Sequence, residues 1–214
     1  MLEYDLSRPR DAADPSTVAV LLHGRGSHRG DLQGLRSRLP DDWTLITPQA
    51  PHPGHPWGYG PGWAWYRYLQ EDRVDGESLE RSLEAMDAFL DQLSGLVGFT
   101  PGTLILGGFS QGGTVSMAYA LTRPDRVSAV VNFSGFLVDS PLLDGDVLSS
   151  EAPPVFWGHG LRDPNIPHHL ARRGRERLAD AGVPLRAGDY EIGHWIDPAE
   201  VEDALDFVEA VGEA

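Results

Sequence analysis

The hydrophobic pattern of the chain alternates short apolar runs with longer amphipathic segments. The short runs have the length and β-branched content of strands, and they lie at residues 17–22, 44–47, 103–106, 127–133, 153–157 and 185–190. The run at 127–133 is almost entirely apolar, which is typical of a strand buried in a parallel sheet. The alternation predicts an α/β fold with a mostly parallel central sheet flanked by helices on both faces. Residues 2–6 are expected to add an edge strand.

The longer segments carry apolar residues at helical spacing. They predict helices at residues 75–96, 114–121, 166–181 and 198–211, and a shorter one around Leu32, Leu35 and Leu39. Between the second strand and the first long helix lies a loop, at about residues 51–68, that is rich in glycine, proline and aromatic residues. No repeat, low-complexity tract or linker interrupts the 214 residues, so we expect one domain over residues 1–214.

The composition is that of a globular protein, with 41% apolar and 23% charged residues, but its charge is unusual. The formal net charge is −15, and all 17 basic residues are arginine. Such a surface repels nucleic acid and anionic membranes, so we expect neither as a partner. Two explanations of the acidity stay open: a salt-adapted host, or a genome biased toward arginine codons.

Compartment and assembly follow only partly from the sequence. No apolar run approaches the length of a membrane span, and Met1 to Asp5 lacks the basic-then-apolar layout of a signal peptide, so we expect a cytoplasmic protein without stable membrane association. The chain has no cysteine, which excludes disulfides and thiolate chemistry. A homodimer stays open, because a dimer patch looks like any other apolar surface in sequence.

A serine flanked by glycines lies between the apolar run at 103–106 and the predicted helix at 114–121. Gly108, Ser110 and Gly112 form a G-x-S-x-G pattern, which in a strand–turn–helix context is typical of a nucleophile elbow. The small neighbours allow strand and helix to approach closely, and the helix N-terminus directs N–H groups toward the serine. The alternative is an ordinary tight turn. The context predicts that Ser110 is a nucleophile.

A serine nucleophile needs a base and an acid that orients the base. In hydrolases with a doubly wound sheet these follow in the order Ser, Asp or Glu, His, from loops after later strands. Asp163 follows the predicted strand at 153–157, and His194 follows the one at 185–190. We therefore predict Ser110, Asp163 and His194 as the catalytic residues. The alternative for Asp163, which precedes a proline, is turn initiation.

Other acids and histidines compete for these roles. Asp189, Glu191 and Asp197 lie too close to His194 in sequence to orient it well. His159 is interpreted as a structural neighbour of Asp163. His23 and His28 do not follow the last strand, as a triad base should. The other histidines are expected at the surface: these are His23 and His28 in the first group, and His52, His55, His168 and His169 in the second.

Attack on a carbonyl also needs hydrogen-bond donors for the oxyanion that develops. The backbone N–H of Gln111, directly after the nucleophile, is one expected donor. The second is expected in the loop after the strand at 17–22, where we assign it to the N–H of Arg25, with Gly24 and Gly26 as alternatives. Taken alone, this segment would read as a simple turn.

These motifs together resemble the phospholipase/carboxylesterase family of α/β-hydrolases, which includes acyl-protein thioesterases and small bacterial carboxylesterases. The resemblance covers most of the chain and rests on His23-Gly24-x-Gly26, Gly108-Phe109-Ser110-Gln111-Gly112-Gly113, Phe133-Ser134-Gly135, Gly158-His159-Gly160-x-x-Asp163-Pro164 and Gly193-His194. It implies an α/β-hydrolase fold, the triad and oxyanion donors named above, and no metal or cofactor. The implied substrates are small esters of short to medium acyl chains, with protein thioesters or lysophospholipids as alternatives.

The aromatic loop at residues 51–68 departs from that family in Trp57, Tyr59 and the surrounding prolines. Trp63, Trp65 and Tyr66 resemble an aromatic group near the family's pocket and are expected to bind substrate, as part of a lid or pocket wall; ordinary core packing is the alternative. Arg25 stands where thioesterase relatives usually have an apolar residue, which favours a polar or anionic acyl part. A binding protein that kept the fold but lost turnover remains the alternative of a different class.

Overall fold

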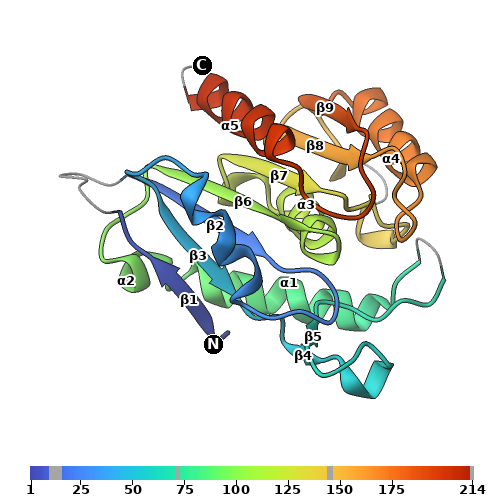
Figure 1. Cartoon of the computed structure of the whole chain (residues 1–214), viewed down its shortest axis with the longest axis horizontal. Helices are drawn as coiled ribbons and strands as arrows, with labels where there is room; N and C mark the ends of the chain where they lie inside the picture. The colour runs from blue at the N-terminus through green and yellow to red at the C-terminus, as the bar shows by residue number, and fades with distance from the viewer. Residues whose placement is uncertain (10–15, 71–72, 144–146, 213–214) are drawn as a thin grey trace.

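The computed structural model describes residues 1–9, 16–70, 73–143 and 147–212, and a seven-stranded sheet forms its centre (Figure 1). The strands are β1 (Tyr4–Ser7), β2 (Thr17–Leu22), β3 (Thr44–Pro48), β6 (Thr103–Phe109), β7 (Ala129–Phe133), β8 (Val155–Gly160) and β9 (Leu185–Tyr190). Their order in the sheet is β1-β3-β2-β6-β7-β8-β9. Only β1 runs antiparallel to its neighbour, and the rest pair in parallel. The predicted α/β fold is confirmed.

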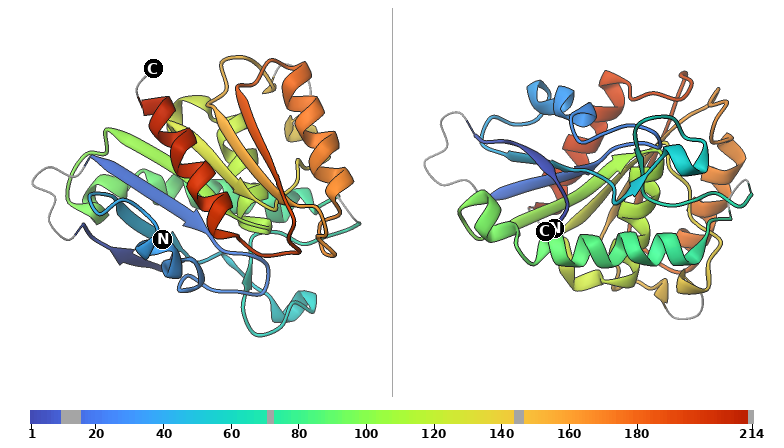
Figure 2. Two further views of the ribbon diagram at one scale, coloured as in Figure 1. Left: turned by 45° about the horizontal axis from the view of Figure 1, so that its top comes forward. Right: turned by 90° about the horizontal axis from the view of Figure 1, so that it is seen from below.

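Helices cover both faces of this sheet (Figure 2). One face carries α1 (Gly76–Leu90), α2 (Leu93–Val97), α3 (Gln111–Thr122) and α4 (His168–Asp180), and the other carries the 3-10 helix η1 (Asp31–Ser37) and α5 (Pro198–Gly212). Alternate strand residues divide between the two cores because successive side chains point to opposite faces. In β2, for example, Val18 and Val20 pack in the core with α1 and α3, whereas Ala19 and Leu21 pack with η1.

The aromatic loop contains short regular elements of its own. β4 (His52–Pro53) pairs antiparallel with β5 (Trp63–Ala64), and the 3-10 helix η2 (His55–Trp57) lies between them. Two backbone hydrogen bonds tie β5 to the loop after β2: Gly26 N–H donates to the Trp63 carbonyl at 2.8 Å, and Trp63 N–H donates to the Ser27 carbonyl at 2.8 Å. Two further 3-10 turns are η3 (Pro124–Arg126) and η4 (Pro141–Leu143).

Three helices differ from their predicted bounds by more than one residue. The helix expected over residues 114–121 begins earlier, at Gln111. The helix expected over residues 75–96 is divided into α1 and α2, with Asp91 and Gln92 between them. Neither residue is glycine or proline, so the sequence pattern did not indicate the break. The helix expected from Ile166 begins at His168 instead. Pro167 disfavours the helical conformation for the residue before it, which accounts for the later start.

The turn from β6 to α3 is packed directly against the end of β2. A Cβ atom added to Gly112 would overlap the carbonyl oxygen of Leu22, and one added to Gly108 would overlap the same oxygen and the Gly112 backbone. Positions 108 and 112 therefore accept only glycine if β2 is to stay this close to the β6–α3 turn. By contrast, a Cβ added to Gly95, on the exposed side of α2, would meet no atom within 4 Å.

This difference predicts opposite effects of the same substitution at two glycines. Gly112→Ala should lower the free energy of unfolding by about 2 kcal/mol or more, because the backbone must move apart to admit the methyl group. Gly95→Ala should leave it unchanged or raise it by up to about 1 kcal/mol, since alanine is the better helix former. Urea unfolding of both variants measures this. Equal stability of Gly112→Ala and the wild type would contradict the packing described.

Candidate active site

Ser110 occupies the sharp turn between β6 and α3. Its φ of 56° lies in the left-handed region, which costs a non-glycine residue on the order of 1–3 kcal/mol. Two hydrogen bonds hold this conformation: its N–H donates to the Phe133 carbonyl in β7 at 2.8 Å, and its carbonyl accepts from Thr114 N–H at 3.0 Å. The serine hydroxyl is thereby fixed at the carboxyl end of the sheet, at the N-terminus of α3.

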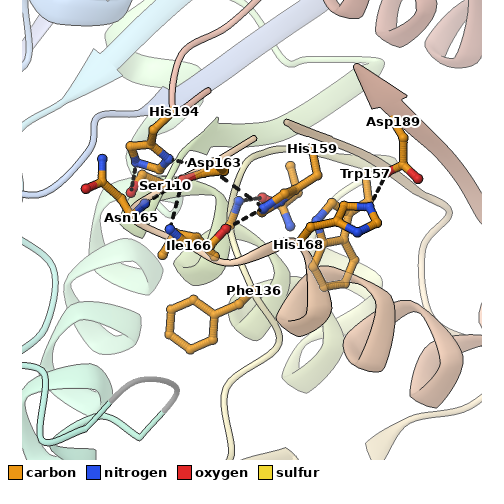
Figure 3. A network of polar contacts seen from close by, with 12 residues as sticks. Ser110, Phe136, Trp157, His159, Asp163, Asn165, Ile166, His168, Asp189 and His194 are labelled. Atoms are coloured by element: carbon orange, nitrogen blue, oxygen red, sulfur yellow. Dashed lines mark hydrogen bonds and ion pairs between the residues drawn. The ribbon is translucent and has the colours of Figure 1, made fainter. Parts of the chain in front are cut away.

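His194 and Asp163 lie beside this serine, in loops after β9 and β8 (Figure 3). His194 Nε2 is 2.9 Å from Ser110 Oγ, and His194 Nδ1 is 2.6 Å from Asp163 Oδ2. A carboxylate only accepts hydrogen bonds, so the proton of this contact is on Nδ1, and Nε2 faces the serine hydroxyl. The structure thus brings the three predicted residues into one hydrogen-bonded chain.

The carboxylate of Asp163 is held from both of its oxygens. Oδ1 accepts hydrogen bonds from the backbone N–H groups of Asn165 at 2.8 Å and Ile166 at 2.9 Å, which leaves Oδ2 for His194. Burial opposes ionisation of this group, but the hydrogen bonds from His194, Ile166 and Asn165 outweigh it and hold the pKa of Asp163 below its usual range. Asp163 is therefore ionised at neutral pH and fixed in orientation.

His159 lies beside Asp163 and is fully buried (Figure 3). Its Nε2 is 2.8 Å from the Ile166 carbonyl and 3.7 Å from Asp163 Oδ2. Burial lowers the pKa of His159, so the ring is neutral, and Nε2–H donates to the carbonyl. The hydrogen bond from His159 to the Ile166 carbonyl joins the end of β8 to the loop that carries Asp163. It agrees with the structural position expected for His159 from the sequence.

The competing acids are engaged elsewhere. Asp189 accepts from Arg175 at 2.6 Å and lies 2.9 Å from His168 Nε2, while the Glu191 carboxylate lies 3.3 Å from Arg162. Asp197 Oδ1 accepts from a backbone N–H at the start of α5. Among the histidines expected at the surface, His168 and His52 are in fact half-buried, because each is held by a partner across the chain.

The loop after β2 and the first residue of α3 supply backbone donors near Ser110. Gly26 N–H is committed to the Trp63 carbonyl, which removes Gly26 as an alternative donor. In the described part of the chain, the N–H groups of Arg25 and Gly24 have no acceptor. Gln111 is the first residue of α3, so its N–H has no partner within the helix. Its side chain is fixed by Trp65 N–H, which donates to Oε1 at 3.0 Å.

His23, which the sequence excluded as a base, holds the loop after β2 in place. Ala50 N–H donates to its Nε2 at 3.1 Å, so the proton is on Nδ1, which donates to the Gly24 carbonyl at 2.8 Å. Burial lowers the pKa of His23 to about 4, which keeps the ring neutral. The Trp65 indole N–H donates to the His23 carbonyl at 2.9 Å. No local sequence signal distinguishes this role, since Ala50 and Trp65 are distant from His23 in the chain.

The aromatic residues expected to bind substrate lie outside the cavity at Ser110. Trp65 and Tyr66 are fully buried in the core, and Trp63 lines a separate cavity near the N-terminus. Trp65 and Tyr66 instead bond the Gln111 side chain, through the Trp65 N–H and the Tyr66 carbonyl. Of the nearby aromatic residues of this loop, Tyr68 lines the cavity.

That cavity opens directly above the serine and has a volume of about 570 Å³. Ser110 and His194 form its floor, and Arg25, Tyr68 and Ile166 are among the residues of its wall. Its size is that of a small-molecule site. The residues that the structure describes include no group of three metal-binding side chains and no helix long and apolar enough to cross a bilayer.

A buried carboxyl group lies beneath the loop that carries His194. Glu200, in the first turn of α5, is fully buried against Gly158 of β8. One of its oxygens accepts from Asp197 N–H at 3.3 Å, and the other has no partner among the described residues. Burial raises the pKa of Glu200 to about 8, so this carboxyl group is mostly protonated at neutral pH.

The mostly parallel sheet, with its strained serine between β6 and α3, defines the chain as an α/β-hydrolase. Comparison with known proteins gives the particular family. A phospholipase/carboxylesterase family model matches residues 9–212, so the chain belongs to the phospholipase/carboxylesterase family. It is accordingly a serine hydrolase that acts on esters, of carboxylesterase or acyl-protein thioesterase type.

Individual relatives agree with this assignment. Acyl-protein thioesterase 1 of Emericella nidulans is 26% identical over 216 residues, covering 92% of this chain and 90% of the relative. The structure of esterase PE8 is 29% identical with a TM-score of 0.81, covering 98% of this chain and 99% of that one. The carboxylesterase of Bacillus cereus has a TM-score of 0.82 at 20% identity, covering 99% and 95%, and shows the shared fold.

The buried Glu200 predicts a pH-dependent stability. Its pKa is higher in the folded chain than in the unfolded one, so the folded state binds the proton more tightly and loses stability as the pH rises from about 4.5 toward about 8. Glu200→Gln removes this loss. In urea unfolding, the free energy of unfolding of the variant relative to that of the wild type should increase by a few kcal/mol when the pH is raised from 5 to 8.5.

The exposed Glu202 of the same helix provides the matched control. Glu202→Gln should alter stability by less than about 0.5 kcal/mol at both pH values. A stability difference between Glu200→Gln and wild type that stays constant with pH would contradict the buried, protonated carboxyl group.

Proposed function

We propose that the chain hydrolyses small carboxylic esters with Ser110 as nucleophile, His194 as general base and Asp163 as the residue that orients His194. One observation carries the proposal: the continuous hydrogen-bonded chain from Ser110 Oγ through His194 to Asp163, with distances of 2.9 and 2.6 Å. In this proposal His194 donates from Nδ1 to Asp163 and accepts at Nε2 from Ser110 Oγ, which is the arrangement that a base needs before attack.

In this mechanism His194 takes the proton from Ser110 Oγ as that oxygen attacks the ester carbonyl. The negative charge on the carbonyl oxygen is stabilised by the backbone N–H groups of Gln111 and Arg25, at the N-terminus of α3 and in the loop after β2. His194 then gives its proton to the departing alcohol, leaving an acyl-enzyme. Water activated by His194 attacks the acyl-enzyme, and the acid and free Ser110 are released.

Acyl groups of short to medium length suit the cavity best. Its volume of about 570 Å³ accommodates a small ester, and its wall includes the polar side chains of Arg25, Asp31 and Asn165. An acyl-protein thioester or a lysophospholipid is the second candidate, because thioesterases occur among the relatives and the family model carries the phospholipase name.

The triad predicts distinct losses for two substitutions. Ser110→Ala should lower kcat on p-nitrophenyl butyrate by at least about 10⁴-fold. Asp163→Asn should lower it by roughly 10³- to 10⁴-fold, because His194 is then held in the wrong tautomer, with its proton on Nε2. A fluorophosphonate probe should label Ser110 in the wild type, and peptide mapping by mass spectrometry identifies the labelled residue.

Ser134 is the matched control, since it is the second non-glycine residue at positive φ, with φ of 54°, and lies outside the cavity wall. Ser134→Ala should therefore keep both turnover and labelling. Wild-type activity in Ser110→Ala would overturn the mechanism. An unlabelled Ser110 in folded wild type would favour a binding protein that retains the fold without turnover.

Acyl preference separates the two candidate substrate classes. With p-nitrophenyl esters from acetyl to decanoyl, kcat/KM should peak between the shortest and middle members, because a wall that carries Arg25, Asp31 and Asn165 gives a long apolar chain little apolar surface to contact. A peak at decanoyl, or a faster reaction with a palmitoyl thioester or a lysophospholipid, would replace the small-ester proposal by the second candidate.

A further inference from the structure

The Arg25 side chain lies at the cavity wall between two aromatic rings. Its guanidinium carbon is 5.0 Å from the centre of the Tyr59 ring and 5.3 Å from that of Tyr68. Both distances are within the range of cation–π attraction. Tyr59 and Tyr68 are themselves joined, since Tyr68 N–H donates to the Tyr59 hydroxyl at 2.8 Å. The two rings therefore restrain the guanidinium of Arg25, which is itself exposed to solvent.

The hydrogen-bonding edge of this guanidinium is not used by the described part of the chain. Arg25 has no ion pair or side-chain hydrogen bond among the described residues. Asp31, the acid that shares the cavity wall, accepts instead from Ser27 Oγ at 2.7 Å. Arg175 differs in this respect. It also lies over an aromatic ring, but its guanidinium donates hydrogen bonds to Asp189 and to two backbone carbonyls.

The sheet order places Arg25 on the acyl side of the site. The leaving alcohol must lie near His194, which reaches Ser110 from the β8 and β9 side, because His194 donates its proton to that alcohol. Arg25 belongs to the loop after β2, which borders β6 on the opposite side. In the proposed mechanism the backbone N–H of Arg25 contacts the carbonyl oxygen of the ester. The guanidinium of Arg25 therefore lies within one extended arginine side chain of the reacting carbon, on the side away from the leaving group.

We propose that Arg25 selects esters whose acyl group ends in a carboxylate, such as half-esters of medium-length dicarboxylic acids; this rests on the function proposed above. A planar guanidinium with a free edge fits one carboxylate with two parallel hydrogen bonds. One cation in a wall that also carries Asp31 matches a monoanion better than a doubly charged phosphate. The net charge of −15 repels anions in general, so a preference for an anionic substrate must come from a local cation.

The test compares three esters of matched length: monoethyl adipate, ethyl hexanoate, and the hexanoyl ester of glycolate, which carries its carboxylate on the alcohol side. Acid release is followed in a pH-stat. Wild type should prefer monoethyl adipate to ethyl hexanoate by about tenfold in kcat/KM, mainly through a lower KM, as expected for a hydrogen bond to a charged group. Raising NaCl from about 0.05 to 1 M should reduce that preference.

Arg25→Met should bring the ratio of the two rates close to one, and Arg25→Lys should keep part of it, because lysine retains the charge without the planar edge. Using a ratio cancels any common effect of the substitution on the Arg25 backbone. Arg38→Met changes the net charge equally at an exposed position outside the cavity, and it should retain the wild-type ratio.

Three results would overturn the inference while leaving the proposed function intact, provided that wild type hydrolyses ethyl hexanoate through Ser110. These are a wild-type ratio near one, a ratio that survives in Arg25→Met, and a preference for the glycolate ester. If Ser110→Ala hydrolyses the esters as fast as wild type, the proposed function itself fails, and the inference with it. Thermal melts of each variant verify that it is folded.

Discussion

The carbonyl oxygen of Leu22 lies so close to the β6–α3 turn that it leaves no room for a side chain at Gly108 or Gly112. This contact sets the distance between β2 and the start of α3, and so between the two segments that present backbone N–H groups to the cavity. Ser110 adopts its positive φ within the same turn, held by hydrogen bonds to β7 and α3. The positions of the proposed nucleophile and of the proposed oxyanion donors therefore depend on one close approach.

Much of the fold and the core of the site could be predicted because their signals are local. Apolar runs and glycine placement located β2, β6 and β9 to within a few residues, and the order of Ser110, Asp163 and His194 along the chain follows from parallel strands that end at one edge of the sheet. The break between α1 and α2 had no such signal, since ordinary residues form it.

The rest of the site depends on contacts between distant segments, which a single sequence does not specify. His23 looks like any histidine after a strand until Ala50 and Gly24 bond its two ring nitrogens. Trp65 was expected in the pocket wall, yet its indole supports the loop after β2 from within the core. Glu200 reads as an ordinary charge in the first turn of a helix, and only its packing against β8 shows that it is buried.

The attachment of the aromatic loop to the loop after β2 has a kinetic consequence. Trp63 exchanges backbone hydrogen bonds with Gly26 and Ser27, and Trp65 bonds both His23 and Gln111. Swinging this segment away, as a lid would require, breaks the bonds that hold the proposed oxyanion donors in position. Substrate must therefore enter an already assembled site, and the entry rate is set by diffusion into an open cavity and not by the opening of this segment.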